Sequence, residues 1–296
     1  MMRSGKAAQR PLCSFKAHSS GFTLAEMAIV LVIMGLVILT VFPALTSLRQ
    51  SGQQALTQSN LRSLMTATAA FVQSNGCLPC PAIPGGTKAN FGKVSTSTNS
   101  GCGACTAAQG IPPFASLGVP PSTARDGWGH WITMRVDTGL TNPTPTVVPP
   151  TAPCTEADVT SGYCISSQIG FAVKGLCKKG TASSTVKVTT IMPSEKGATQ
   201  NAAVIFVSHG QAGYGSYAAT PAKNGNPLPF PSNYLECSAY GGFARCNAND
   251  DVQFYDAPIV IGDTDPYDDV LAYADRNTLV SMLGSGACAS TWGGTP

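Results

Sequence analysis

The sequence predicts an α+β fold in which one long N-terminal helix packs against an antiparallel β-sheet. Residues 22–76 follow a helical pattern, whereas the chain beyond them is rich in Gly, Pro, Ser, Thr and Cys and contains short β-branched segments. A helix followed by strands, rather than alternating with them, is typical of an α+β domain. With 296 residues and 43% apolar content, the chain is also long enough to bury a core.

Composition and charge exclude several classes of function. Only 11% of residues are charged, whereas Gly and Pro contribute 31 and 22 residues, a profile that argues against a cytosolic helical enzyme. The net charge of +3 depends on four cations before residue 22, namely Arg3, Lys6, Arg10 and Lys16. Without them the balance of charged side chains is slightly negative. Because nucleic-acid binding needs clustered Lys and Arg, no nucleic acid is expected as a partner.

The first element is an apolar helix. Residues 27–48 carry no charge, and 22 helical residues cover about 33 Å, the thickness of a bilayer's hydrocarbon core. A cleaved secretory signal, a permanent membrane anchor and a buried core helix are all open interpretations. An ordinary signal peptide has its small-residue cleavage site after the apolar stretch, but here the small residues 19–21 precede it.

Glu26 is an acid at the start of this apolar block. A carboxylate near hydrocarbon costs about 2.5 kcal/mol or more and is rare without a partner. A positive group is therefore expected to neutralise it. Cleavage after Gly21 would create such a group, the new amine of Phe22, which can pair with Glu26 of its own chain or of a neighbouring copy.

The residues GFTLAE at positions 21–26, with a basic leader before them and an apolar helix after them, resemble the N-terminal cleavage and methylation motif of type IV prepilins and type II secretion pseudopilins. The resemblance implies a pilin-like fold and a membrane-embedded aspartyl peptidase that cuts after Gly21 and methylates Phe22. It also implies that Glu26 serves subunit recruitment and assembly. Gly35 and Pro43 match positions where the family often carries a helix-loosening glycine and a kink-forming proline.

The second half of the helix is amphipathic. Pro43 lacks an N–H, so a bend or a melted turn is expected at residues 39–43. Beyond it an apolar stripe predicts packing against the protein's own sheet, with Asn75 and Gly76 as the stop signal. The helix would measure about 80 Å. The stripe consists of Leu56, Leu61, Leu64, Met65, Thr68, Phe71 and Val72.

The resemblance divides the chain into three parts. Residues 1–21 are expected to be a cytoplasmic leader that is removed, residues 22–76 the helix, with 22–48 as its transmembrane and assembly part, and residues 77–296 a periplasmic or extracellular head. In the head, residues 77–123 read as loops joined by cysteines, and a Pro-rich surface loop is expected at 142–153. Strands are predicted at 131–136, 169–173, 186–191 and 203–207, and a last helix at 278–283.

The segment 126–131 is similar to a tight turn of the major pseudopilin of type II secretion. Asp126, Trp128 and Gly129 match it, whereas Trp131 departs from the usual tyrosine. The glycines suit a tight turn into a strand, with the Trp128 indole filling the seam between helix and sheet. The LPCP element at residues 78–81 is similar to larger pseudopilin-like proteins.

Ten cysteines follow the leader, an even number that suits a disulfide-bonded exported domain. Two CxxC pairs lie 21 residues apart, so a zinc site is an alternative. A redox role for the first CxxC fails because such motifs open a helix after a strand. Short-loop pairs Cys154 with Cys164 and Cys237 with Cys246 are the suggested pairings. The disulfide candidates are Cys77, Cys80, Cys102, Cys105, Cys154, Cys164, Cys177, Cys237, Cys246 and Cys288.

Two further groups could carry chemistry. One is an aspartate cluster, for which oxygen ligands suit Ca²⁺; the major pseudopilins carry a calcium loop near the C-terminus, and a solvated acidic turn is the alternative. The other is Ser208-His209, but it lacks the G-x-S-x-G turn of a hydrolase. No enzymatic activity and no certain cofactor are therefore expected. The aspartates are Asp263, Asp265, Asp268 and Asp269.

The sequence thus predicts a structural subunit of a type II secretion pseudopilus or a type IV pilus. By resemblance, its expected partners are other pilin or pseudopilin subunits, the prepilin peptidase, an inner-membrane assembly platform and a secretion ATPase. Its expected location is the inner membrane, with a single span and a periplasmic head, and then the pilus or pseudopilus. The alternative is a pilus-borne adhesin, in which the head binds a ligand and the helix only displays it.

Overall fold

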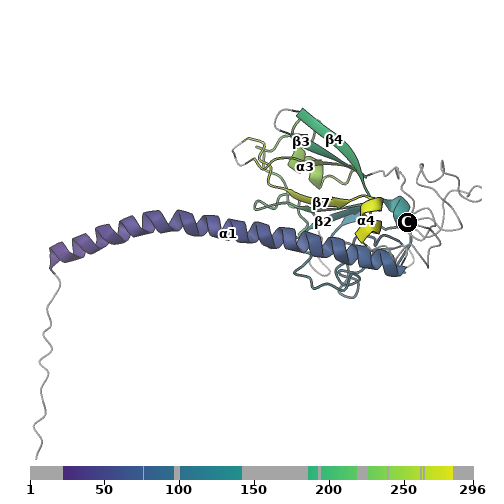
Figure 1. Cartoon of the computed structure of the whole chain (residues 1–296), viewed down its shortest axis with the longest axis horizontal. Coiled ribbons are helices and arrows are strands. Elements are labelled where there is room, and N and C mark those ends of the chain that lie inside the picture. Colours follow the sequence, from purple (N-terminus) through teal and green to yellow (C-terminus); the bar gives the residue numbers. More distant parts are fainter. Residues whose placement is uncertain are drawn as a thin grey trace, which may run out of the picture. The chain divides into compact units, whose positions relative to one another are not determined.

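The structure, a computed structural model, describes residues 23–75, 77–96, 101–141, 186–192, 195–218, 226–238, 240–260, 262 and 264–282 (Figure 1). The chain divides into two compact units, residues 1–50 and 51–296. Helix α1, Leu24–Asn75, runs along the chain from the first unit into the second. Within the described ranges, no helix combines the length and the hydropathy needed to cross a membrane.

In the first unit, α1 presents apolar side chains that the rest of the unit does not cover. Leu24 is 91% exposed and Leu39 is 72% exposed. Gly35 lies in the helix with open space where a side chain would begin. Of the bend or melted turn expected at residues 39–43, the melted turn is wrong, because this whole stretch is helical. A proline removes one backbone hydrogen bond, and the remaining bonds of the turn keep Pro43 within the helix.

A four-stranded antiparallel sheet lies at the centre of the second unit, in the order β1-β2-β5-β7. Its strands are β1 (Gln109–Gly110), β2 (Thr133–Val136), β5 (Val204–Ser208) and β7 (Val270–Ala274). A 3-10 helix, Thr138–Leu140, follows β2. Successive side chains of a strand point to opposite faces of the sheet, and every residue of β5 is buried. The central sheet is therefore covered on both faces.

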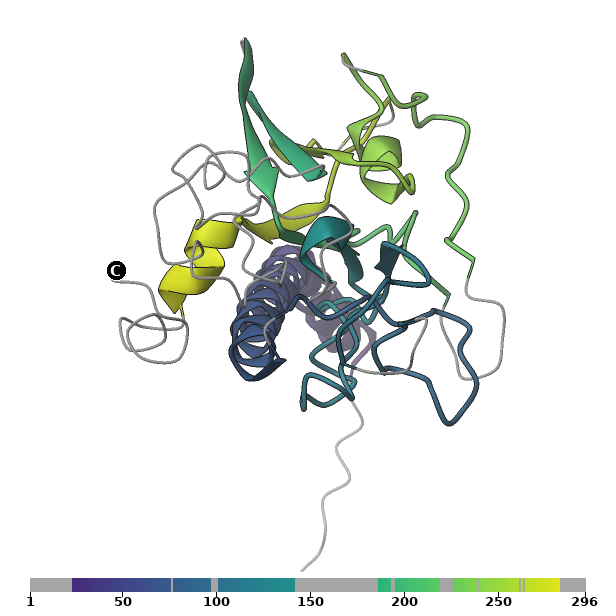
Figure 2. The same ribbon diagram turned by 90° about the vertical axis from the view of Figure 1, so that its right-hand side faces the viewer.

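One face of this sheet packs against the second half of α1. Val204 and Phe206 of β5 belong to the same apolar cluster as the helix stripe, which also receives Leu279 from helix α4, Arg276–Met282. Figure 2 shows α4 beside the end-on view of α1. The predicted stripe is confirmed as buried except for Leu56, which is 50% exposed, and Phe71 is buried outside this cluster. The helix residues of this cluster are Leu61, Leu64, Met65, Ala69 and Val72.

The other face packs against a three-stranded sheet in the order β4-β3-β6. Ile205 and Val207 of β5 meet Val188 and Phe254 there. Strands β3 and β4 are antiparallel, but β3 and β6 are parallel, which departs from the antiparallel sheet expected. A parallel pair requires a long connection, and here it includes helix α3, Phe243–Ala248. The strands are β3 (Val186–Met192), β4 (Glu195–Ala202) and β6 (Gln253–Asp256).

The strands predicted at 131–136, 186–191 and 203–207 are confirmed as β2, β3 and β5, and the last helix is confirmed as α4. Strands β1, β4, β6 and β7 and helix α3 were not predicted. The strand predicted at 169–173 and the loop predicted at 142–153 lie outside the described residues. The α+β class itself holds, with a long N-terminal helix followed by a largely antiparallel sheet.

Candidate processing and assembly site

The start of α1 is a capping box formed by Thr23 and Glu26. The Thr23 backbone N–H donates to Glu26 Oε2 at 2.8 Å, and the Thr23 hydroxyl donates to the same oxygen at 2.9 Å. In return, the Glu26 backbone N–H donates to Thr23 Oγ1 at 3.2 Å. A T-x-x-E sequence satisfies two of the backbone donors that a helix leaves free at its N-terminus. The helix therefore begins directly after Thr23.

This arrangement shows what Glu26 does in a single chain. Its carboxylate is exposed and one oxygen is occupied by Thr23, while Oε1 makes no hydrogen bond within the described residues. The carboxylate can therefore accept a further donor from outside the chain. Gly21 and Phe22, the expected cleavage and methylation residues, lie outside the described residues. Glu26 is predicted from the sequence and Thr23 is not, although the T-x-x-E spacing is a sequence signal for a helix start.

The predicted turn at residues 126–131 is built around the carboxylate of Asp126. Asp126 Oδ1 accepts the backbone N–H groups of Trp128 and His130 at 3.0 and 2.9 Å, and Oδ2 accepts the Ser208 hydroxyl at 2.8 Å. Gly129 has a φ of +92°, in the left-handed region that favours glycine. The carboxylate thus fixes the turn and ties it to the end of β5.

Gly127 makes the closest approach of this turn to α1. Its backbone N–H donates to Thr57 Oγ1 at 2.9 Å, and that hydroxyl donates to the Gln53 carbonyl. A side chain at residue 127 would begin 2.0 Å from the Gln53 carbonyl oxygen. Trp128, which was expected in the seam, is half-buried, and its Nε1 has no hydrogen-bond partner in the described structure. The turn thus reaches the helix through the backbone of Gly127, and the expected packing of the Trp128 indole in the seam stays a prediction.

Two disulfides staple the loops that follow α1. Cys77 is joined to Cys102 and Cys80 to Cys105, so each CxxC pair is split between two bonds. Zinc coordination would need these four sulfurs as free thiolates at one centre. The structure therefore selects the disulfide interpretation over zinc, and Cys77 and Cys80 do not form the disulfide of a redox motif. Four further candidates lie outside the described residues: Cys154, Cys164, Cys177 and Cys288.

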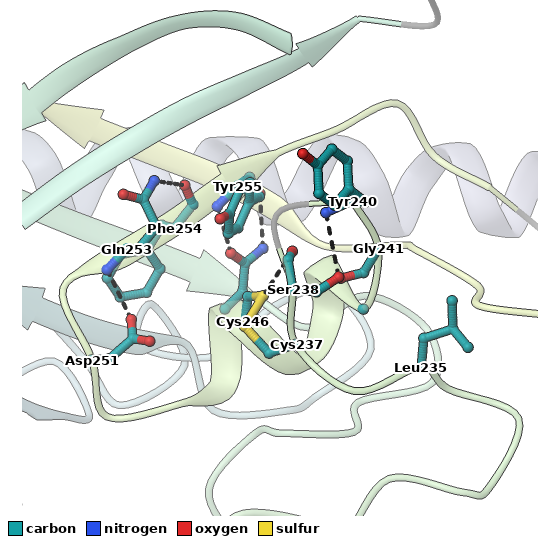
Figure 3. The surroundings of a disulfide bond; sticks show 12 residues. Leu235, Cys237, Ser238, Tyr240, Gly241, Cys246, Asp251, Gln253, Phe254 and Tyr255 are labelled. Carbon is teal, nitrogen blue, oxygen red and sulfur yellow. Dashed lines mark hydrogen bonds between the residues drawn. A yellow bond between two sulfur atoms is a disulfide. The ribbon is translucent and has the colours of Figure 1, made fainter. Parts of the chain in front are cut away.

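The third disulfide joins Cys237 and Cys246, the short-loop pair that the sequence suggested (Figure 3). The loop between them presents Tyr240, whose side chain is 96% exposed. Asp265 holds the loop, because its carboxylate accepts the backbone N–H groups of Leu235 at 3.3 Å and Gly242 at 2.9 Å. This disulfide and this carboxylate together fix an exposed aromatic side chain on the head.

The aspartate cluster binds backbone amides. Asp265 is occupied by the loop just described, and Asp268 Oδ2 accepts the Ala212 N–H at 3.0 Å. Burial raises the pKa of the Asp268 carboxyl, and this hydrogen bond opposes the rise. Among the described residues, no three candidate ligands lie close enough to hold a metal ion; Asp263 lies outside them. The calcium hypothesis therefore has no support in the described part of the head.

His209 lies in a buried polar network at the end of β5. Its Nε2 is 2.9 Å from Thr133 Oγ1, and its Nδ1 faces Asp269 Oδ1 at 3.6 Å. Asp269 Oδ2 also accepts the Asn247 side-chain amide at 2.9 Å. An acid, a histidine and a hydroxyl in this order resemble a catalytic triad, but His209 and Thr133 are each only 1% exposed. The network links the ends of strands β2, β5 and β7.

Comparison with known proteins adds one match. The model of the prokaryotic N-terminal methylation motif matches residues 16–42, a stretch that contains the capping box and the apolar start of α1. A search of the curated proteins and a search of the solved structures each found no match. The motif implies an N-terminal membrane anchor, processing by the prepilin peptidase and assembly with other pilin subunits. The chain therefore carries the signature of type IV prepilins and pseudopilins, on an α+β head with disulfide-stapled loops.

Proposed function

We propose that this chain is a structural subunit, a pseudopilin or minor pilin, of a type II secretion pseudopilus or a type IV pilus. The observation that carries the proposal is the match at residues 16–42 together with Glu26 in the first turn of α1. Before cleavage, the subunit is anchored in the inner membrane with its head in the periplasm. After cleavage behind Gly21, an inner-membrane assembly platform adds it to a filament of other subunits.

The chemistry of the helix start supports this sequence of events. Cleavage creates an ammonium group on Phe22, and the Oε1 atom of Glu26 is free to accept it from a neighbouring copy. The exposed apolar side chains of residues 24–39 then pack against the helices of neighbouring subunits. This contact is stabilised because it removes the apolar surface of these side chains from water or lipid headgroups. The three disulfides suit a head that works in an oxidising compartment.

We further propose that the head works without catalysis. Ser208 and His209, the one serine–histidine pair that suggested a hydrolase, are both buried, and their hydrogen bonds serve the network around β5. A general base must reach the proton it removes from a substrate. The absence of turnover by the purified chain with esters, peptides and disulfides is the expected result, and turnover that is lost in His209→Ala would contradict it.

Two variants test the proposed processing and assembly. Gly21→Val should leave a full-length precursor in membranes, which mass spectrometry of the intact chain would detect. Glu26→Gln should be cleaved normally but enter filaments at a tenth of the wild-type level or less, because a neutral amide pairs poorly with an ammonium group. Glu236→Gln, which removes an exposed acid from the head, is the matched control and should assemble normally.

Either of two results would overturn the proposal: a mature N-terminus at a residue other than Phe22, or normal filament entry by the Glu26→Gln variant. The first would leave an ordinary tethered ectodomain. The second would show that Glu26 is not neutralised by a neighbouring amine.

An adhesin displayed by the pilin helix is the second candidate. The exposed Tyr240 on a loop held by Cys237–Cys246 favours it, because a rigid aromatic side chain is a common anchor in recognition. Deletion of the gene distinguishes the two roles. Loss of filaments or secretion supports the structural subunit, whereas loss of surface binding with intact filaments and secretion supports the adhesin.

A further inference from the structure

A hollow of about 750 Å³ lies in the second unit, beside the C-terminal end of α1. Phe71 of α1 lines it together with loop residues from 83–96 and 101–116. Figure 2 shows the loops of residues 77–96 gathered next to α1. Its volume is within the range of about 300–1,000 Å³ found for ligand pockets. The hollow is distinct from the start of α1 and from the buried network around His209.

The walls of the hollow are held in place by covalent and hydrogen bonds. The disulfides Cys77–Cys102 and Cys80–Cys105 join residues 77–80, which lead into the first loop segment, to the second. The Thr106 N–H donates to the Ser95 carbonyl at 2.9 Å, and the Val94 N–H donates to the Ser116 hydroxyl at 3.0 Å. A site held in this way loses little conformational entropy when a ligand binds.

Several polar side chains line this hollow. The hydroxyls of Thr87, Ser95 and Thr106 and the side-chain amide of Asn90 make no hydrogen bonds to the described residues. Water must satisfy these groups in the free protein, and a ligand with its own hydroxyls can replace that water at little cost. Ile83 adds an exposed aliphatic surface to the same wall. The hollow thus offers several neutral donors and acceptors beside a small apolar surface.

The charge of the hollow has one sign. Lys93 lines it, is exposed and forms no ion pair with the described residues. The described residues that line the hollow include no carboxylate, and the sequence contains no Asp or Glu from residue 27 to residue 125. A single ammonium group suits one carboxylate, whereas a nucleic-acid backbone would require several cations.

We propose that this hollow binds an acidic oligosaccharide. One sugar carboxylate pairs with the Lys93 ammonium, and the ring hydroxyls bond to Asn90 and to the threonine and serine hydroxyls of the walls. The carbon face of a sugar ring packs on Ile83. The proposal concerns the head alone and does not depend on how the chain is processed or assembled.

Isothermal titration calorimetry tests the proposal, using the cleaved chain with its whole helix and head in detergent. The probe is tri-galacturonate. Its methyl ester is the uncharged probe with the same sugar rings. The free acid should bind and the ester should bind about tenfold more weakly, because a charge-assisted hydrogen bond is lost. Lys93→Gln should weaken binding of the free acid about tenfold, and Asn90→Ala should weaken it several-fold for both probes.

Lys88→Gln is the matched control, because it removes the same charge from the same loop without lining the hollow. It should bind the free acid as the wild type does. No binding of the free acid, equal binding of acid and ester, or an equal loss in Lys88→Gln and Lys93→Gln would overturn the proposal. Lys93 and Asn90 are both exposed, and unchanged circular dichroism of each variant confirms that a loss of binding is not a loss of fold.

Discussion

Gly127→Ala tests how the head is fixed to its own helix. A Cβ at residue 127 would lie 2.0 Å from the carbonyl oxygen of Gln53 and 2.6 Å from the carbonyl carbon, so the turn must move away from α1. Overpacking of this kind costs about 1–3 kcal/mol. The movement also breaks the hydrogen bond from the Gly127 N–H to Thr57, worth about 1 kcal/mol. The free energy of unfolding should therefore fall by about 2–4 kcal/mol.

Gly52→Ala is the matched control, because it makes the same chemical change one turn before Thr57. No atom lies within 4 Å of a Cβ at residue 52, and alanine is a better helix former than glycine by about 0.5–1 kcal/mol. This variant should therefore be stabilised by that amount.

Chemical denaturation of the mature chain, followed by tryptophan fluorescence, measures both variants. The two shifts should have opposite signs. A Gly127→Ala variant as stable as the wild type would show that the turn does not touch the helix backbone, and a stabilising shift in both variants would show that the close approach to Gln53 does not govern stability.

Three further predictions concern the core, the staples and the buried acid. Phe206→Ala should lower the free energy of unfolding by about 3–5 kcal/mol, because Phe206 is fully buried against α1. The control Val252→Ala, at an exposed position, should change the free energy of unfolding by about 0.5 kcal/mol or less. Similar losses in both variants would contradict the assigned core. Replacing all four of Cys77, Cys80, Cys102 and Cys105 by serine opens a loop with a separation of 25 residues and should cost about 3.5 kcal/mol or more, against about 2.6 kcal/mol for replacing Cys237 and Cys246 with a separation of 9; urea unfolding of the two variants checks the order. The folded-state pKa of Asp268 is raised above its ordinary value of 3.8 by burial, so its proton stabilises the fold below that pH and the stabilisation is lost as pH rises through the raised pKa. Asp268→Asn should therefore flatten the dependence of unfolding free energy on pH above 3.8, and an unchanged slope would refute the assignment.

The sequence was most informative where local pattern decides structure. The stripe from Leu61 to Val72 predicts the face of α1 that packs on the sheet, because helical spacing alone brings these side chains together. The β-branched run of β5 predicts a strand for the same reason. Strand β4 escaped prediction because its sequence EKGATQNA is polar and carries no period-two apolar pattern; its pairing with β3 makes it a strand.

The sequence was least informative where the fold brings distant residues together. Ten cysteines leave the pairing open, and the crossed pairs Cys77–Cys102 and Cys80–Cys105 follow only from the path of two loops. The spacing of the two CxxC motifs fits zinc as well as disulfides. The aspartate cluster raised the idea of calcium because its partners, the amides of Ala212 and Gly242, are distant in sequence. The same local sequence pattern is therefore compatible with more than one kind of bond or ligand.

Of the two candidate sites, the start of α1 could be predicted from the sequence and the hollow in the head could not. Glu26 could be found from sequence because a processing enzyme must recognise a linear segment, and Thr23 completes that segment within one helical turn. The hollow lined by Lys93 could not be found, because its walls come from three separate stretches of chain. Both faces of the central sheet are covered, one by α1 and one by the second sheet. The recognition proposed for the head would therefore come from its loops, and the stapled loops beside α1 contain the polar hollow on which that proposal rests.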